Sequence, residues 1–157
     1  MAGILFTDGR FTLSGVNKYS EMTGIGGKKK GEETPVQTAL RETIEELFEP
    51  EEIPSGFFEE LYSKLVFDNM MAKSNYRTFI MNFNDLKVFF VTAKKYNLKS
   101  KVYDVLPSTI QDLILERKVV KGVELRYMML IPNLPLHTEL DFDGCFVNDI
   151  IDLKPRE

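Results

Sequence analysis

The stretch from residue 33 to residue 49 constrains the fold of this chain more than any other. On an α-helix, where successive residues turn by about 100°, its carboxylates gather on one face, which carries Glu42, Glu45, Glu46 and Glu49. The opposite face carries Val36, Leu40, Thr43, Ile44 and Leu47. Thr34 suits the N-cap, Pro35 suits the first helical position, and Pro50 prevents the helix from continuing. The pattern predicts an amphipathic helix that packs an apolar stripe on a core and presents four carboxylates together.

Carboxylates gathered in this way repel one another. Like charges one helical turn apart destabilise a helix by about 0.2–0.5 kcal/mol per pair, and none of the four glutamates has a lysine one turn away on its face. A divalent cation such as Mg²⁺, which prefers oxygen ligands, would reverse the sign of that interaction. A loop rich in glycine and lysine, residues 24–32, precedes the helix and suits the close approach of a phosphate. The alternative is a solvated acidic face without a ligand.

The spacing of these residues resembles the box of the Nudix hydrolase family. Gly27 is followed after five residues by Glu33, and after seven more by the run RETIEE at positions 41–46. The specified positions that match in register are Gly27, Glu33, Arg41, Glu42, Glu45 and Glu46. Three positions depart from the box, because Thr43 and Glu49 stand where aliphatic residues are usual and Phe48 replaces the closing glycine. The matching motif covers about a sixth of the chain.

Phe48 leads to a specific expectation about the end of the helix. The family's glycine suits a left-handed helix C-terminus, and that conformation is sterically unfavourable for phenylalanine. We therefore expect the helix to continue to Glu49 and to be ended by Pro50. Phe48 is then expected to pack against residues 57–65.

The resemblance implies a fold and a reaction. The expected fold class is α/β (α+β), with a Nudix-like mixed sheet sandwiched between helices, and residues 1–157 are expected to form a single Nudix hydrolase domain. The expected enzyme is a Nudix pyrophosphohydrolase, which acts on phosphorus-containing acid anhydrides. It would use Mg²⁺ or Mn²⁺ to hydrolyse a diphosphate linkage in a nucleoside diphosphate joined to another group.

The resemblance also implies roles for residues of this chain. The expected metal ligands are Glu42, Glu45, Glu46 and the backbone carbonyl of Gly26 or Gly27. The expected catalytic residues are Glu42, Glu46 and Arg41, and the substrate-binding residues are Gly27, Lys28 and Lys30. Glu33 is expected to brace the loop together with Arg41. The general base varies across the family, and the candidates here are Glu42, Glu124, Glu139 and Asp141.

The composition excludes several other kinds of site. A single cysteine, Cys145, allows no internal disulfide and no multi-cysteine zinc site, and it is expected to be a small core residue. A single histidine, His137, cannot build a histidine-based metal cluster, and it is expected at the surface. The sequence has no run long enough to span a membrane and no signal peptide pattern, so we expect a cytoplasmic protein without a membrane partner.

The charge distribution bears on the substrate. Residues 32–60 hold ten glutamates and one arginine, whereas residues 94–121 hold seven basic side chains and three acidic ones. A phosphorylated small molecule, a nucleotide, is the expected partner. Capped RNA is an alternative substrate, because the basic stretch suits a phosphate backbone, and the protein would then be an mRNA decapping enzyme. A diphosphoinositol polyphosphate is another alternative substrate, suggested by the three lysines at 28–30. The protein could also be a non-catalytic nucleotide-binding module.

Local patterns predict the remaining elements. Residues 4–6 and 11–13 flank an Asp-Gly pair and predict a type I′ hairpin. Strands are expected at 76–83, 86–92 and 123–131, with a break at 84–85 and a loop at 68–75. The 86–92 stretch also fits a helix, because Leu86, Phe89, Phe90 and Ala93 share helical spacing, but its composition favours a strand. Further helices are expected from residue 55 and from Pro107.

Overall fold

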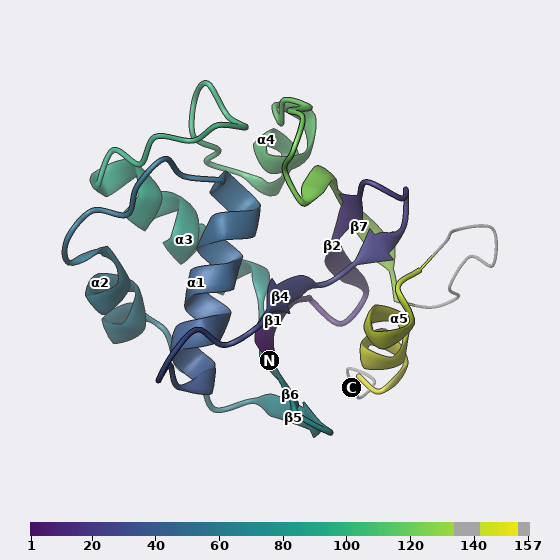
Figure 1. The fold of residues 1–157 in the computed structure, drawn as a ribbon. Helices are drawn as coiled ribbons and strands as arrows, with labels where there is room; N and C mark the ends of the chain where they lie inside the picture. The colour runs from purple at the N-terminus through teal and green to yellow at the C-terminus, as the bar shows by residue number, and fades with distance from the viewer. Residues whose placement is uncertain (134–141, 154–157) are drawn as a thin grey trace.

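The computed structural model describes residues 1–133 and 142–153, and it contains both strands and helices (Figure 1). The strands are β1 (Ala2–Phe6), β2 (Phe11–Asn17), β3 (Met22–Thr23), β4 (Ile25–Gly27), β5 (Met70–Lys73), β6 (Tyr76–Met81) and β7 (Leu125–Pro132). The helices are α1 (Pro35–Phe48), α2 (Phe57–Lys64), α3 (Phe83–Lys95), α4 (Ile110–Leu115) and α5 (Gly144–Ile151). The strands form a four-stranded sheet, β4-β1-β6-β5, and a three-stranded sheet, β3-β2-β7. The expected α/β (α+β) class is confirmed, and the four-stranded sheet is mixed, because β1 runs antiparallel to β4 and parallel to β6.

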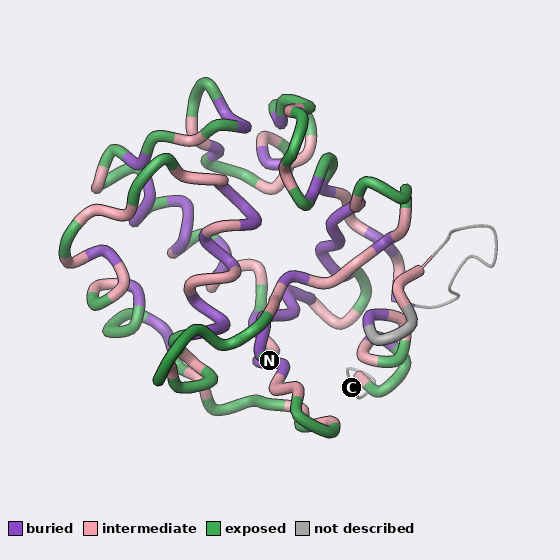
Figure 2. Tube along the Cα trace, in the orientation of Figure 1, coloured by how far each residue is buried: buried purple, intermediate pink, exposed green. Residues whose placement is uncertain are grey.

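Strand β1 lies between helices on both faces of the four-stranded sheet. All five of its residues are buried. Alternate residues of a strand point to opposite faces, and those of β1 divide between two apolar clusters. Ala2, Ile4 and Phe6 belong to the main core with residues of α1, α2 and α3, whereas Leu5 packs with Phe146 and Ile150 of α5. Figure 2 shows the resulting burial, with the exposed positions concentrated in the outer loops and turns.

Helix α1 begins as the sequence predicts. Thr34 is the N-cap, with a reciprocal capping box to Gln37, and Pro35 is the first helical residue. Leu40, Ile44 and Leu47 are almost completely buried. The end differs from the expectation, because the helix stops at Phe48 and Glu49 adopts the left-handed conformation with φ of 43°. The α region is disfavoured before proline, so Pro50 ends the helix one residue earlier than expected.

Phe48 avoids the left-handed conformation, as expected. It remains helical and fully buried, in the same core cluster as Phe57, Leu61 and Leu65. The left-handed position falls on Glu49, whose N–H donates to the Glu45 carbonyl oxygen over 2.9 Å.

The predicted hairpin at the N-terminus is wrong. Asp8 and Gly9 do form a tight turn, in which Asp8 Oδ1 accepts the N–H groups of Arg10 and Phe11 over 2.8 Å. Beyond one isolated bridge, from Thr7 to Thr12, the two strands separate into different sheets. Strand β1 is apolar on both faces, which suits a strand flanked by two others, and β2 pairs with β7 along most of its length.

The predicted strand at residues 86–92 is also wrong, because this stretch belongs to α3. Asn82 and Asp85 form a capping box, so the predicted break at 84–85 is the first turn of the helix. Leu86, Phe89, Phe90 and Ala93 are buried on one face. Helical periodicity and a cap therefore outweigh the strand-like composition of residues 88–91.

Other elements follow or refine the expectations. Helix α2 and strand β7 lie close to their predicted positions, and β6 covers most of the predicted strand. Helix α4 begins later than the predicted start at Pro107, because Thr109 is its N-cap and Ile110 its first residue. The predicted loop at 68–75 contains β5, which pairs antiparallel with β6, and the loop at 24–32 begins with β4. No helix in the described ranges is long and apolar enough to cross a membrane.

Candidate functional site

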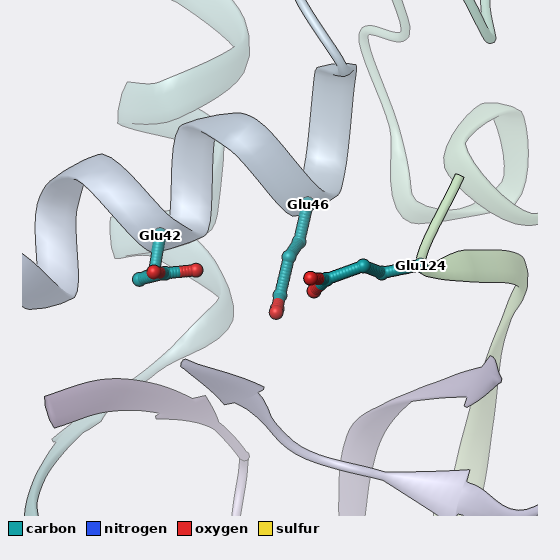
Figure 3. Close-up of side chains that lie close together, drawn as sticks. All are labelled: Glu42, Glu46 and Glu124. Atoms are coloured by element: carbon teal, nitrogen blue, oxygen red, sulfur yellow. The ribbon is translucent and has the colours of Figure 1, made fainter. Parts of the chain in front are cut away.

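Three glutamate side chains meet beside α1 (Figure 3). Glu42 and Glu46 lie one turn apart on α1, and Glu124 immediately precedes β7. One carboxylate oxygen from each residue lies within 4.8 Å of those from the other two. Figure 3 shows the ends of the Glu46 and Glu124 side chains close to each other. Glu46 is only 5% exposed, whereas Glu124 is exposed, so the group has a buried end and an open end.

Burial and mutual repulsion disfavour the charged forms of two of these acids. Burial raises the pKa of Glu46 well above its usual value, and the negative charge of Glu124 raises it further. The N–H of Gly26, which donates to Glu46 Oε2 over 3.1 Å, opposes that rise. Burial also raises the pKa of Glu42, against the lowering effect of Arg41. The group therefore favours a proton or a cation among its oxygens, and carboxylate oxygens are ligands that Mg²⁺ accepts.

Arg41 connects the glycine loop to the acidic face of α1. Its Nε donates to Glu33 Oε2 over 2.7 Å, and its Nη2 donates to the Lys28 carbonyl oxygen over 2.7 Å. Its Nη1 donates to Glu42 over 3.0 Å and to Glu45 over 3.1 Å. The hydrogen bond from Arg41 lowers the pKa of Glu33 to about 2. One guanidinium thus holds the loop and two of the helix carboxylates in fixed relative positions.

Glu45 lies outside the three-glutamate group. Its carboxylate pairs with Arg41, and the Nζ of Lys30 lies 3.8 Å from its other oxygen. From the sequence, Glu45 was grouped with Glu42 and Glu46 as a metal ligand. Glu124, which the sequence suggests only as a possible general base, lies beside Glu42 and Glu46. Arg41, one turn before Glu45, and Lys30 from the loop both supply positive charge to this face of the helix.

Two glycines let β4 pass close to the acidic group. A Cβ atom on Gly27 would lie 2.4 Å from the carboxyl carbon of Glu42. A Cβ atom on Gly26 would lie 2.0 Å from the hydroxyl oxygen of Tyr76. The Gly26 Cβ would also lie 2.8 Å from the Ala2 carbonyl oxygen, which is part of the backbone, whereas the Gly27 Cβ would meet the end of the flexible Glu42 side chain, which can move aside.

The other candidate residues have mixed placements. The backbone N–H of Lys30 donates to Glu33 Oε1 over 2.7 Å, so Lys28 and Lys30 contribute backbone groups to the brace. Their side chains belong to exposed residues. Glu139 and Asp141, suggested as general bases, and His137 lie outside the described residues, as does the side chain of Cys145.

Arg117 fastens the C-terminal end of α1 to β7, a role that the sequence did not reveal. It is 7% exposed, although it was counted in the basic stretch proposed for RNA. Its Nη1 donates to the Leu47 carbonyl oxygen over 2.7 Å, and its Nη2 donates to those of Glu46 and Leu125 over 2.8 and 2.9 Å. The guanidinium therefore links the backbone of Glu46 to the residue after Glu124. A positive charge at a helix C-terminus is also favourable.

Other cations of the 94–121 stretch have partners within the protein. Lys95 pairs with Glu60 over 2.6 Å, and Lys118 pairs with Asp104 over 2.7 Å. Lys94 contacts the hydroxyl of Ser108. These contacts reduce the number of side chains that are free to follow a phosphate backbone.

A cleft of about 820 Å³ opens beside the acidic group, with Glu46 and Glu124 in its wall. Its lining also includes Lys18, Tyr19, Lys121 and Arg126. A cleft of similar volume, about 840 Å³, lies elsewhere, against Asp8, Asp68, Asp85 and Asp152. We place the candidate site at the first of these clefts because it contains the converging carboxylates.

In comparisons with known proteins, no family model matches this chain, and no curated protein matches it at a significant level. The argument for function consequently depends on the residues of the chain and on their geometry.

Proposed function

We propose that the protein is a metal-dependent hydrolase that cleaves a diphosphate linkage in a nucleoside diphosphate joined to another group. The observation that carries the proposal is the convergence of Glu42, Glu46 and Glu124 within 4.8 Å, with Glu46 buried. The Nudix-like spacing of residues 27–46 supports the same reaction, and the bonds between Arg41 and Glu33 suit the bracing role that this resemblance implies.

The donor set fits Mg²⁺ or Mn²⁺. Three carboxylates supply hard oxygen ligands. Burial raises the pKa values of Glu42 and Glu46 because it disfavours their negative charge, and a bound cation would offset that cost. Glu42, Glu46 and Glu124 would hold the ion, and Glu42 would do so while it also accepts a hydrogen bond from Arg41. Glu45, which pairs with the same guanidinium, lies outside this group. When bound, the cation supplies charge stabilisation for the phosphoryl oxygens.

We assign the remaining roles in the hydrolysis to residues of the chain. Water attacks one phosphorus atom, the bond from that phosphorus to the bridging oxygen breaks, and the proton of the water passes to a carboxylate. Glu124 is exposed and lines the cleft, whereas the Glu42 carboxylate already accepts a hydrogen bond from Arg41. Among the described candidates, Glu124 is thus better placed to accept this proton, at the carboxylate oxygen that would not hold the ion.

Metal dependence is the first test of the proposal. We expect hydrolysis of a panel of nucleoside diphosphate derivatives in Mg²⁺ or Mn²⁺ and its loss in a chelator, measured by chromatography of the products. A free ion at a hundred times its Kd stabilises the folded state by about 2.7 kcal/mol. For a domain of this size, this corresponds to a rise in melting temperature of roughly 5–10 °C. Full turnover in the chelator would contradict the proposal.

The close contact at Gly27 gives a second test. In Gly27→Ala, the new methyl group displaces the Glu42 carboxylate. Because misorienting a metal ligand typically weakens metal binding by about tenfold or more, we expect a rise of this size in the Kd for Mn²⁺. Electron paramagnetic resonance measures this Kd. Glu42→Ala is the matched background, because it removes the group with which the methyl collides. Adding Gly27→Ala to Glu42→Ala should leave the Kd unchanged. Equal effects of Gly27→Ala in both backgrounds would rule out this steric explanation.

A further inference from the structure

The clefts of the described residues differ in charge. The 820 Å³ cleft beside the acidic group carries three cations, Lys18, Lys121 and Arg126. Its acidic residues, Glu46 and Glu124, both belong to the three-glutamate group. By contrast, the 840 Å³ cleft is lined by four aspartates and no lysine or arginine. A third cleft, of about 590 Å³, has Asp143 and Asp149 in its wall together with Lys73.

The wall of the 820 Å³ cleft also presents an aromatic ring. Tyr19 is 70% exposed, and the Nζ of Lys18 lies 5.1 Å from the centre of its ring. The turn that carries this ring is held by Asn17, whose Oδ1 accepts the N–H groups of Tyr19 and Glu21 over 2.9 and 3.1 Å. The backbone on which the ring stands is thus fixed by hydrogen bonds.

We propose that this cleft binds the substrate as a nucleotide of small-molecule size, with its base stacked on Tyr19 and a phosphate beyond the scissile diphosphate held by Lys121 and Arg126. The proposal rests on the proposed function, because it places the diphosphate at Glu46 and Glu124. It makes Tyr19, Lys121 and Arg126 the residues that select the substrate.

Three physical arguments support this choice of ligand. Every nucleobase has a π-face that can stack on an aromatic side chain, whereas an inositol ring has none. A cleft of about 820 Å³ lies within the usual range for small-molecule sites. Lys121 and Arg126 lie outside the three-glutamate group, so they would still attract negative charge when a metal ion neutralises the glutamates. Together these features favour a ligand that has a nucleobase to stack on Tyr19 and at least one phosphate beyond the scissile diphosphate.

The test uses a nucleoside triphosphate analogue in which imido groups replace both bridging oxygens, so that neither linkage is hydrolysed, together with Mg²⁺ and the full chain, and titration calorimetry measures its Kd. Tyr19→Ala should raise the Kd by about tenfold, in line with measured base-stacking losses, and Tyr19→Phe should recover most of the affinity because it keeps the ring. The double variant Lys121→Ala/Arg126→Ala should also raise the Kd by about tenfold and make it less sensitive to salt. The controls are Tyr62→Ala, an exposed tyrosine on α2, and Lys87→Ala/Lys99→Ala, two exposed lysines outside the cleft lining.

The outcomes separate this inference from the proposed function. If the wild type hydrolyses a diphosphate while Tyr19→Ala and the double variant keep the wild-type Kd and KM, the cleft assignment is overturned and the hydrolase proposal stands. If the triphosphate analogue binds with the expected dependence on Tyr19 but no diphosphate is hydrolysed, the cleft assignment stands and the hydrolase proposal fails. Equal losses in the variants and in their controls would also overturn the cleft assignment.

Discussion

Glu46→Gln is expected to lower the rate of diphosphate hydrolysis by at least about a hundredfold, the scale of losing a few kcal/mol of transition-state stabilisation. Glutamine keeps the shape of the side chain but removes the negative charge from the buried end of the three-glutamate group. The same change should remove most of the rise in melting temperature that Mg²⁺ or Mn²⁺ produces. Glu52→Gln, on an exposed residue just after α1, is the matched control and should behave as the wild type.

Comparison with Glu45→Gln makes this prediction specific to the observed geometry. The sequence treats Glu45 and Glu46 alike, but the structure pairs Glu45 with Arg41 and leaves Glu46 in the three-glutamate group. We therefore expect a smaller rate loss in Glu45→Gln than in Glu46→Gln. A larger loss in Glu45→Gln would mean that the metal lies on the Arg41 side of the helix.

In the absence of metal, Glu46→Gln should not destabilise the protein. Burial raises the folded-state pKa of Glu46 above its unfolded value of about 4.5. The folded state therefore binds more protons between these two pKa values, and the free energy of unfolding falls as the pH rises through that interval. Because Glu46→Gln removes this penalty, the metal-free variant should be at least as stable as the wild type at neutral pH, and the difference should shrink near pH 4. Chemical denaturation across this pH range measures the effect.

The parts of the fold that depend on local signals could be predicted from the sequence. Thr34 and Pro35 mark the start of α1, and the period of its apolar residues identifies the buried face. The same kinds of signal were present for α3, where Asn82 and Asp85 form a cap and Leu86, Phe89 and Phe90 share one face. In α3 these signals outweigh the strand-like composition, because periodicity and capping describe how a helix buries its apolar face and satisfies its backbone.

The parts that depend on distant contacts could not be predicted. No local pattern indicates that β1 leaves β2 after the Asp8–Gly9 turn and pairs with β6, some seventy residues later. Likewise, Glu42 and Glu46 are neighbours on any helix, but the position of Glu124 beside them depends on how the segment before β7 meets α1. Sequence spacing thus identifies two of the three glutamates as neighbours, and tertiary packing places the third beside them.

Arg117 bonds to the backbone on both sides of this tertiary contact, and Arg117→Met is expected to destabilise the protein strongly. The change removes the donors to the carbonyl oxygens of Glu46, Leu47 and Leu125 and keeps an unbranched but shorter apolar side chain. Leaving a buried acceptor without a partner costs about 1–3 kcal/mol, so a loss on the order of 3 kcal/mol or more follows. For a domain of this size, the melting temperature should fall by roughly 6–12 °C.

Arg117→Lys and Lys99→Met complete the experiment. Lysine keeps the charge near the end of α1 but cannot bridge three carbonyl groups with a planar fork, so Arg117→Lys should fall between the wild type and Arg117→Met. Lys99→Met removes an exposed cation from the same stretch and should leave the melting temperature almost unchanged.

The Kd for Mn²⁺, measured well below the melting temperature, separates positioning from stability alone. If Arg117 holds Glu124 against Glu46 through the backbone of Leu125, the Kd should rise in Arg117→Lys even while the protein remains folded. A lower melting temperature with an unchanged Kd would mean that Arg117 stabilises the fold without setting the distance between the two carboxylates. Arg117→Met with the stability of the wild type would show that water replaces the guanidinium at all three carbonyl oxygens.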